Sequence, residues 1–363
     1  MCPSANVGSA AKSCPSPNPL PDGERAIGPA PTRRTRNIQP RIAIPPALSP
    51  AAFHRRQVGA PVVTCTGQTM GTSWSARIVA APEGIAAAIQ AELDRVVAEM
   101  RHWAPDSALS RFNRSDPGRW PPLPIGFAKV LAAALDVADK SDGAFDPAMG
   151  ALVDLWGFGP PGPREDLPSD TEIAAASAAS GRIHIEQDDR RARRHAEAAL
   201  DFSGIAKGHG VDRVAEMLRS MELHDFLVEV GGELRGEGIK PDGQPWWVDL
   251  EAPPDSRLSP IRAALHGLSV ATSGDYRRSF VHAGRAYAHT LDPRTGRPLD
   301  NGVASVTVLH ASCMLADAWA TALTVLGPEG MALAEREGLA VHMAVREGTG
   351  FAEHLSPALQ AML

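Results

Sequence analysis

The chain has 363 residues, of which 44% are hydrophobic, so it can bury a sizeable core as one large domain or as two ordinary ones. Its formal net charge of -6 comes from intermixed acidic and basic residues without a long basic run, which argues against a nucleic-acid partner. The 4 cysteines include no CxxC pair, and no apolar stretch is long enough to cross a bilayer, which argues against a disulfide framework, a structural zinc site and a transmembrane helix.

The first part of the chain, residues 1–60, is crowded with Pro, Ser, Ala and Arg and has no helical or strand periodicity. This composition predicts a flexible tail that carries none of the chemistry. The tail also lacks the apolar core of a signal peptide, which favours a cytoplasmic protein. We therefore expect one folded domain over residues 61–363, beginning with a hairpin of two strands around a glycine turn in residues 61–80.

Two amphipathic helices are expected next. Apolar residues at spacings of three and four predict a helix over residues 85–100, and a second apolar face predicts a helix over residues 126–140. The segment that follows, GAFDP, has the composition of a tight, ordered turn. Residues 157–170 are rich in Pro and Gly and predict a surface loop, which could be an insertion or a lid.

The second half of the chain mixes strands and helices without a regular βαβ rhythm. Periodicity predicts helices over residues 207–221, after Leu315 and after Pro328. It predicts strands over residues 226–230, 246–251, 268–271 and 304–309. The expected fold class is therefore α+β, with mixed or antiparallel sheets packed with helices.

A glycine-rich helix entry, LDFSGIAKGHGVDRV, combines Asp201, Gly204 and Lys207. Glycines let a ligand approach the backbone closely, and a helix N-terminus beside a lysine favours a phosphate. For this pattern alone, an ordinary helix entry with a solvated lysine is the simpler interpretation, because a lone glycine-rich match is weak.

A strand-to-turn segment, YAHTLDPRTGRPL, brings His289, Asp292 and Arg294 together. Asp-Pro-Arg-Thr-Gly is good turn chemistry by itself, because Pro restricts φ and Gly tolerates unusual backbone angles. Turn formation does not explain the clustering of a histidine, a carboxylate and an arginine. A structural, hydrogen-bonded His289 and a catalytic one are both compatible with the pattern.

A carboxylate and a hydroxyl, Asp317 and Thr321, share one side of an Ala-rich helix. A buried carboxylate is costly unless it is paired or bound to a cation. Magnesium takes one or two protein carboxylates and completes its shell with water and substrate phosphate, so this pair suits it. An Asp that interacts with the helix dipole, with Thr321 bonded back to the helix, is the structural alternative.

Eight motifs in order give these segments a specific meaning: QTMGTSW, WAPDSALSRFN, DGAFDP, LDFSGIAKGHGVD, VEVGGELRGEG, SGDYRR, HTLDPRTGRP and LADAWATAL. The series resembles the FAD:protein FMN transferase family, also called ApbE and formerly described as thiamine-biosynthesis lipoproteins. The resemblance covers residues 67–327 and implies the ApbE-like (T-fold-like) architecture. Many members begin with a lipoprotein signal, whereas Cys2 here has no apolar segment before it.

The resemblance also implies roles for individual residues. Residues expected to line the FAD site are Met70, Trp103, Ala144, Phe145, Asp146, Asp201, Lys207 and Leu291. The magnesium ligands would be Gly204 through its carbonyl, Asp317 and Thr321. His289, Asp292 and the SGDYRR turn would lie beside the diphosphate, with His289 or Asp292 as the base.

Such enzymes transfer the FMN half of FAD to a Ser or Thr hydroxyl of a target flavoprotein and release AMP. With water as the acceptor, the same site would act as a magnesium-dependent FAD pyrophosphatase. A non-catalytic FAD-binding protein is the third hypothesis, and the joint presence of Asp317, Thr321 and His289 argues against it because simple flavin binding needs no metal.

Overall fold

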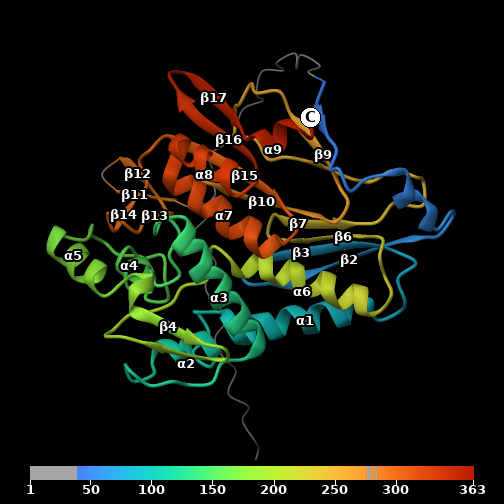
Figure 1. Cartoon of the computed structure of the whole chain (residues 1–363). Coiled ribbons are helices and arrows are strands. Elements are labelled where there is room, and N and C mark those ends of the chain that lie inside the picture. The colour runs from blue at the N-terminus through green and yellow to red at the C-terminus, as the bar shows by residue number, and fades with distance from the viewer. Residues whose placement is uncertain (1–38, 276–278, 283) are drawn as a thin grey trace, which may run out of the picture. The chain divides into compact units, whose positions relative to one another are not determined.

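The computed structural model describes residues 39–275, 279–282 and 284–363. Contacts between Cα atoms divide the chain between residues 37 and 38, and all described residues belong to the second unit. This unit is an α+β fold, as expected, with helices packed on a large antiparallel sheet (Figure 1).

The large sheet contains eight strands among the described residues, and every neighbouring pair is antiparallel. The strands, in spatial order, are β17 (Gly350–Leu355), β16 (Ala340–Glu347), β15 (Val303–His310), β10 (Leu268–Gly274), β7 (Glu233–Glu237), β6 (Phe226–Val230), β3 (Thr72–Val79) and β2 (Val62–Thr69). The β2–β3 hairpin and β6 confirm the predicted strands in those segments.

Alternation of side chains along the strands creates two apolar faces. Phe226, Val228 and Val230 of β6 pack in a cluster with the helices α1 (Ile85–Met100) and α6 (Ala206–Ser220). Leu227, between them, joins a different cluster on the opposite face. The large sheet is therefore covered on both sides.

The opposite face is covered by a three-stranded sheet and a short helix. These elements are β1 (Arg41–Ala43), β9 (Ile261–Leu265), β8 (Trp246–Asp249) and α9 (Pro357–Gln360). β1 pairs in parallel with β9, and Ala43 is fully buried. A 3-10 helix, η1, follows at Pro50–Arg55.

The expectation of a structureless tail over residues 1–60 is therefore wrong for β1 and η1, and residues 1–38 lie outside the described part. A three-residue strand has too short a pattern to stand out among prolines. Pairing with β9, which follows more than 200 residues later, creates it.

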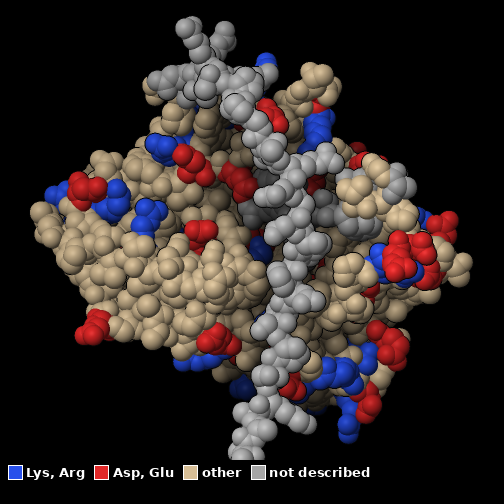
Figure 2. Space-filling model, turned by 180° about the vertical axis from the view of Figure 1, so that it is seen from behind, with Lys and Arg blue, Asp and Glu red and all other residues tan. Residues whose placement is uncertain are grey.

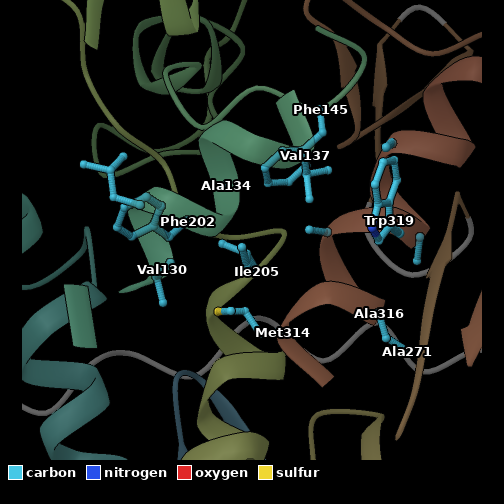
Figure 3. Packing of buried hydrophobic residues seen from close by; sticks show 14 of the residues in the cluster. Val130, Ala134, Val137, Phe145, Phe202, Ile205, Ala271, Met314, Ala316 and Trp319 are labelled. Carbon is cyan, nitrogen blue, oxygen red and sulfur yellow. The ribbon is translucent and has the colours of Figure 1, made fainter. Parts of the chain in front are cut away.

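The largest apolar cluster lies between the helices α3 (Ile125–Lys140) and α7 (Cys313–Leu326) and the strands β10, β15 and β16. Figure 3 shows Val130, Ala134 and Val137 of α3 on one side of it and Met314 and Trp319 of α7 on the other. The N-terminal ends of α6 and α7 also lie close together, since a Cβ at Gly208 would collide with the Cys313 carbonyl oxygen.

Smaller elements surround these layers. They are α2 (Ala108–Asn113), α4 (Gly150–Leu155), α5 (Asp170–Ala178), η2 (Arg182–His184), η3 (Gly327–Gly330), α8 (Met331–Arg336) and the strand pairs β4 (Ile185–Asp188) with β5 (Arg191–Arg194), β11 (Ser279–His282) with β12 (Arg285–Ala288), and β13 (Leu291–Asp292) with β14 (Arg297–Pro298). No helix among the described residues has both the length and the apolar character required to traverse a bilayer.

Candidate active site

Two adjoining cavities, of about 660 Å³ and about 190 Å³, contain most of the expected site residues. Both are lined by Ser203, Lys207 and His289, so they form two parts of one cleft. The larger cavity is also lined by Met70 and Trp103, and the smaller one by Ala144, Phe145, Asp146, Asp201, Gly204, Leu291, Asp317 and Thr321. Segments from six parts of the chain thus meet here.

The entry to α6 forms one wall of the cleft. The Ser203 backbone N–H donates to Asp201 Oδ1 at 2.6 Å, which closes the turn before the helix. A Cβ at Gly204 would lie 3.0 Å from Thr321 Oγ1 and 3.3 Å from the Phe145 ring, so a larger residue there would press on both. The backbone at the entry to α6 therefore approaches the Thr321 hydroxyl of α7.

The α7 helix presents Asp317 and Thr321 to the smaller cavity. Asp317 is only 6% exposed, and its Oδ2 accepts a hydrogen bond from the Gly208 N–H at 3.1 Å. A side chain at Gly208 would collide with the Cys313 carbonyl, so the glycine allows the two helices to approach. The carboxylate consequently lies at the positive end of α6. The dipole that it meets belongs to the neighbouring helix and not, as in the structural alternative, to its own helix α7.

The donors around this point suit a hard cation that keeps part of its shell for other ligands. They are the Asp317 carboxylate, the Thr321 hydroxyl and the backbone of Gly204, all of which line the same cavity. Among the described residues there is no group of three or more His, Cys, Asp or Glu that could hold a metal. A single carboxylate with neutral oxygens fits magnesium better than zinc or calcium.

Lys207 stands where the two cavities join and pairs with Glu233. The Glu233 side chain is fully buried at the start of β7, whereas the Lys207 side chain is 30% exposed. A cation in the first turn of a helix is unfavourable for the helix dipole, and the buried carboxylate offsets this effect.

The segment after β12 places His289 and Leu291 in the cleft but not Asp292. The Asp292 carboxylate accepts bonds from the Arg294 backbone N–H at 2.9 Å and from the Arg294 guanidinium at 2.9 and 2.8 Å. These bonds raise the pKa of Arg294. Asp292 therefore stabilises the turn, as the turn interpretation of this segment anticipated.

Aromatic contacts hold the His289 segment from the other side. The Phe158 ring meets the His289 ring edge to face, with 6.4 Å between centroids. Trp156 stacks on Tyr287 at 6.2 Å and donates its indole N–H to the Gly296 carbonyl at 2.8 Å. Residues 157–169 contain no helix or strand, as predicted, but Phe158 lines the cleft instead of lying on the surface.

The turn at residues 144–146 forms another wall. Asp146 Oδ1 accepts from the Ala148 N–H and Oδ2 from the Arg182 N–H, both at 2.8 Å. Burial raises the pKa of Asp146, although these two bonds lower it. The carboxylate thus organises the backbone as well as lining the cavity.

Met70 and Trp103 border the larger cavity. Met70 lies in the β2–β3 turn with a φ of 49°, followed by Gly71 with a φ of 76°, a pattern typical of a two-residue hairpin turn. Trp103 is 45% exposed, so its ring offers a free face for packing against a flat ligand.

Sequence reasoning missed three residues of the site or its support: Ser203, Phe158 and Glu233. The motif around Ser203 was recognised without assigning this residue a role, and Phe158 was hidden within a loop rich in Pro and Gly. Glu233 lies 26 positions from Lys207, too far for any local pattern to pair them. Of the SGDYRR turn, Ser273 and Gly274 line the smaller cavity, whereas residues 276–278 lie outside the described part.

Known proteins resemble this chain over nearly all of the described part. Residues 70–343 match the model of the ApbE family. The FAD:protein FMN transferase of Vibrio cholerae is 39% identical over 310 residues, which are 83% of this chain and 92% of the relative. That of Haemophilus influenzae is 36% identical over 88% of this chain and 96% of its own.

Solved structures of a flavinyl transferase and of an ApbE protein are also similar to this chain. The apo form of the Pseudomonas stutzeri flavinyl transferase ApbE has a TM-score of 0.78 at 40% identity, covering 84% of this chain and 97% of that one. The ApbE protein of Thermotoga maritima has a TM-score of 0.73 at 31% identity, covering 83% and 99%.

Proposed function

The chain belongs to the ApbE family, and we propose that it transfers FMN from FAD to a Ser or Thr hydroxyl of a target flavoprotein in a magnesium-dependent reaction. Its enzyme class is FAD:protein FMN transferase. The proposal extends this enzyme class by naming magnesium as the metal, a Ser or Thr hydroxyl as the acceptor, and roles for individual residues of the cleft.

The proposal depends mainly on the place where the two cavities meet, which we call the joint and which is lined by Ser203, Lys207 and His289. FAD has two ring systems connected by a diphosphate, and the cleft has two chambers that share Ser203, Lys207 and His289. A diphosphate at this joint would meet the ammonium of Lys207 and the N-terminal end of α6, both of which favour anions. The oxygens of Asp317 and Thr321 line one of these chambers.

In the proposed reaction, the acceptor oxygen forms a bond to the FMN-side phosphorus while the bond from that phosphorus to the AMP oxygen breaks. The proton of the acceptor hydroxyl passes to the His289 imidazole, and AMP leaves with the bridging oxygen. We assign this proton to His289 because it lines both chambers, whereas the Asp292 carboxylate is bound to Arg294.

Magnesium, held by Asp317, Thr321 and the Gly204 carbonyl, would neutralise charge on the diphosphate oxygens. The chain's own contribution is to orient these ligands. The Gly208 N–H holds the Asp317 carboxylate, and the glycine at 204 lets its backbone reach the Thr321 hydroxyl. Lys207, which lines both chambers, would add a second positive charge at the joint.

The decisive experiment uses the full chain with FAD, magnesium and an acceptor domain that carries an Asp-x-x-Ser/Thr-x-Thr site. We expect the mass of the acceptor to increase by one FMN, with AMP released in equal amount. An acceptor whose final Thr is replaced by Val is the matched control and should keep its mass.

The other outcomes identify the alternatives. AMP and free FMN with an unmodified acceptor would show a pyrophosphatase, in which water takes the place of the hydroxyl. FAD that stays bound and intact over the same period would show a binding protein. Either result contradicts the proposed transfer.

A further inference from the structure

The carboxylate of Glu233 lies behind the cleft, at a point where the proposed chemistry does not itself require an acid. It starts β7, directly after the turn formed by Gly231 and Gly232, and its side chain is completely inaccessible to solvent. Glu233 lines neither of the two cavities of the cleft, whereas its partner Lys207 lines both. The ion pair therefore connects the buried interior to the joint of the cleft.

Burial makes this pair strongly interdependent. A carboxylate without solvent is costly unless a cation compensates it, and removing one partner of a buried pair is strongly destabilising because it leaves the other charge uncompensated. The same charges act on the fully buried Cys313 thiol. Burial is the main cause that raises its pKa, the carboxylates of Asp212, Glu233 and Asp317 raise it further, and Lys207 lowers it.

The β6–β7 turn guides the lysine stem. Gly231 has a φ of 60°, and a Cβ at this position would lie 2.8 Å from Thr72 Cγ2 and 3.4 Å from Lys207 Cδ. The glycine thus leaves a passage in which the aliphatic part of Lys207 runs past the turn. With the stem confined by the turn and the ammonium held by Glu233, the lysine has few ways to reorient.

We propose that Glu233 is a positioning residue that holds the Lys207 ammonium at the joint between the two cavities, facing the diphosphate of FAD. This inference rests on the proposed function. Alignment of a charge before the reaction lowers the activation barrier, because the site does not reorganise during the chemical step. Glu233 acts through Lys207 and does not touch the substrate.

The test is a double-mutant cycle with Glu233→Gln, Lys207→Met and the double variant. We expect Glu233→Gln to lower kcat about 10- to 100-fold, since a lost alignment of about 1 Å has effects of this size. The Kd for FAD should change less than about threefold, because the free ammonium still attracts the phosphates. Glu233→Asp, which keeps the charge, should recover part of kcat.

The Lys207→Met background gives the sharper measurement. There the buried Glu233 carboxylate no longer has the Lys207 ammonium to offset its charge behind the joint, so adding Glu233→Gln should tighten FAD binding about tenfold, the sign of strong coupling. The double variant removes both charges of the Lys207–Glu233 pair together, which keeps it foldable if a single variant is not. An equal effect of Glu233→Gln on Kd in both backgrounds would overturn the proposal.

A matched control is Glu92→Gln on α1. Glu92 is also buried, pairs with Arg95 and Arg213, and lines neither cavity of the cleft. A fall in kcat of the same size in both single variants would show a purely structural role for Glu233. If the wild-type chain neither transfers FMN nor hydrolyses FAD, the proposed function fails. The Kd values for FAD in the four proteins of the double-mutant cycle still test the coupling between Glu233 and Lys207.

Discussion

Individual residues in the cleft combine structural and chemical roles, and Asp317 illustrates this most directly. Its carboxylate accepts the Gly208 N–H and also faces the smaller cavity with Thr321. A hydrogen-bond acceptor would suffice for the first role, whereas binding a cation requires the negative charge. Substitutions that separate charge from hydrogen bonding therefore distinguish the two.

We expect Asp317→Ala and Asp317→Asn both to abolish turnover while leaving much of the FAD affinity, because the cation acts mainly on the diphosphate in the transition state. Rates of FMN transfer measured during a magnesium titration test this. Asn keeps an acceptor for Gly208, so near-normal activity of Asp317→Asn would assign the carboxylate to structure alone.

For the proton acceptor, His289→Gln should lower kcat by about 10²- to 10⁴-fold, the usual contribution of a general base. Asp292→Asn should retain most activity, because Asp292 supports the turn through Arg294. The comparison is made at saturating FAD. Equal losses of kcat in the two variants would contradict the assignment of His289, rather than Asp292, as the proton acceptor.

His209, on the α6 helix, makes stability depend on pH. It is 1% exposed, and its pKa is lowered to about 4, mainly by burial and also by the positive charges of Lys129 and Arg213; Asp212 and Glu216 act in the opposite direction. Between the unfolded value near 6.5 and about 4, the unfolded chain binds the extra proton, so stability falls as the pH falls through this window.

The full loss attributable to His209 is about 3 kcal/mol, from roughly 2.5 pKa units at 1.36 kcal/mol each. Urea unfolding of the wild type and His209→Gln at pH 7.5 and pH 4.5 measures it. The difference between the two proteins should be larger at the higher pH. A difference that does not vary with pH would show that His209 has an ordinary pKa in the folded protein.

At the scale of elements, one carboxylate in the middle of α6 holds the N-terminal end of α7. Asp212 of α6 accepts the Cys313 and Met314 N–H groups of α7 at 3.0 Å each and the Ser312 hydroxyl at 2.7 Å. These donors include the first backbone N–H groups of α7, which its own helix leaves without partners. The helix that carries Asp317 and Thr321 is thus oriented by the helix that carries Lys207.

We expect Asp212→Ala to lower the free energy of unfolding by about 2–3 kcal/mol, the cost of several lost bonds to a charged group. It should also lower kcat, because α7 loses its anchor to α6. Denaturant unfolding and FMN transfer rates measure the two effects. Ser169→Ala is the control: it removes the capping box of the peripheral α5 and should cost about 1 kcal/mol without changing kcat.

At the scale of the whole molecule, the described unit begins earlier than the motifs suggest. Arg41 in β1 pairs with Glu353 in β17, and the Ile44 N–H donates to the Met362 carbonyl at 2.8 Å. Charged side chains of both signs are interspersed on the face shown in Figure 2. Paired charges of this kind contribute little singly, and the buried apolar contacts of β1 contribute more.

Two truncations test this boundary. A chain that starts at residue 39 keeps all the contacts described above and should unfold at the same urea concentration as the full chain. A chain that starts at residue 61 loses β1 and uncovers the edge of β9, so its unfolding midpoint should fall. Equal midpoints would show that the segment from residue 39 to residue 60 adds no stability.

Much of this architecture follows from local patterns. The apolar positions Ile85, Ile89 and Leu93 predicted α1, and all three are buried. The β2–β3 hairpin, β6 and the helices α3 and α6 follow from periodicity and turn residues, with ends shifted by at most one residue. The eight motifs in order indicated which segments meet in the cleft, although each motif alone, such as the one around Lys207, is a weak signal.

Only the tertiary structure decided how those segments meet. It joined Lys207 to Glu233, brought Phe158 into the cleft and paired β1 with β9. Periodicity reports which face of an element is apolar, because that property repeats within a few residues. The partner of a buried charge or of an edge strand depends on residues far away in the chain, and the fold alone brings them together.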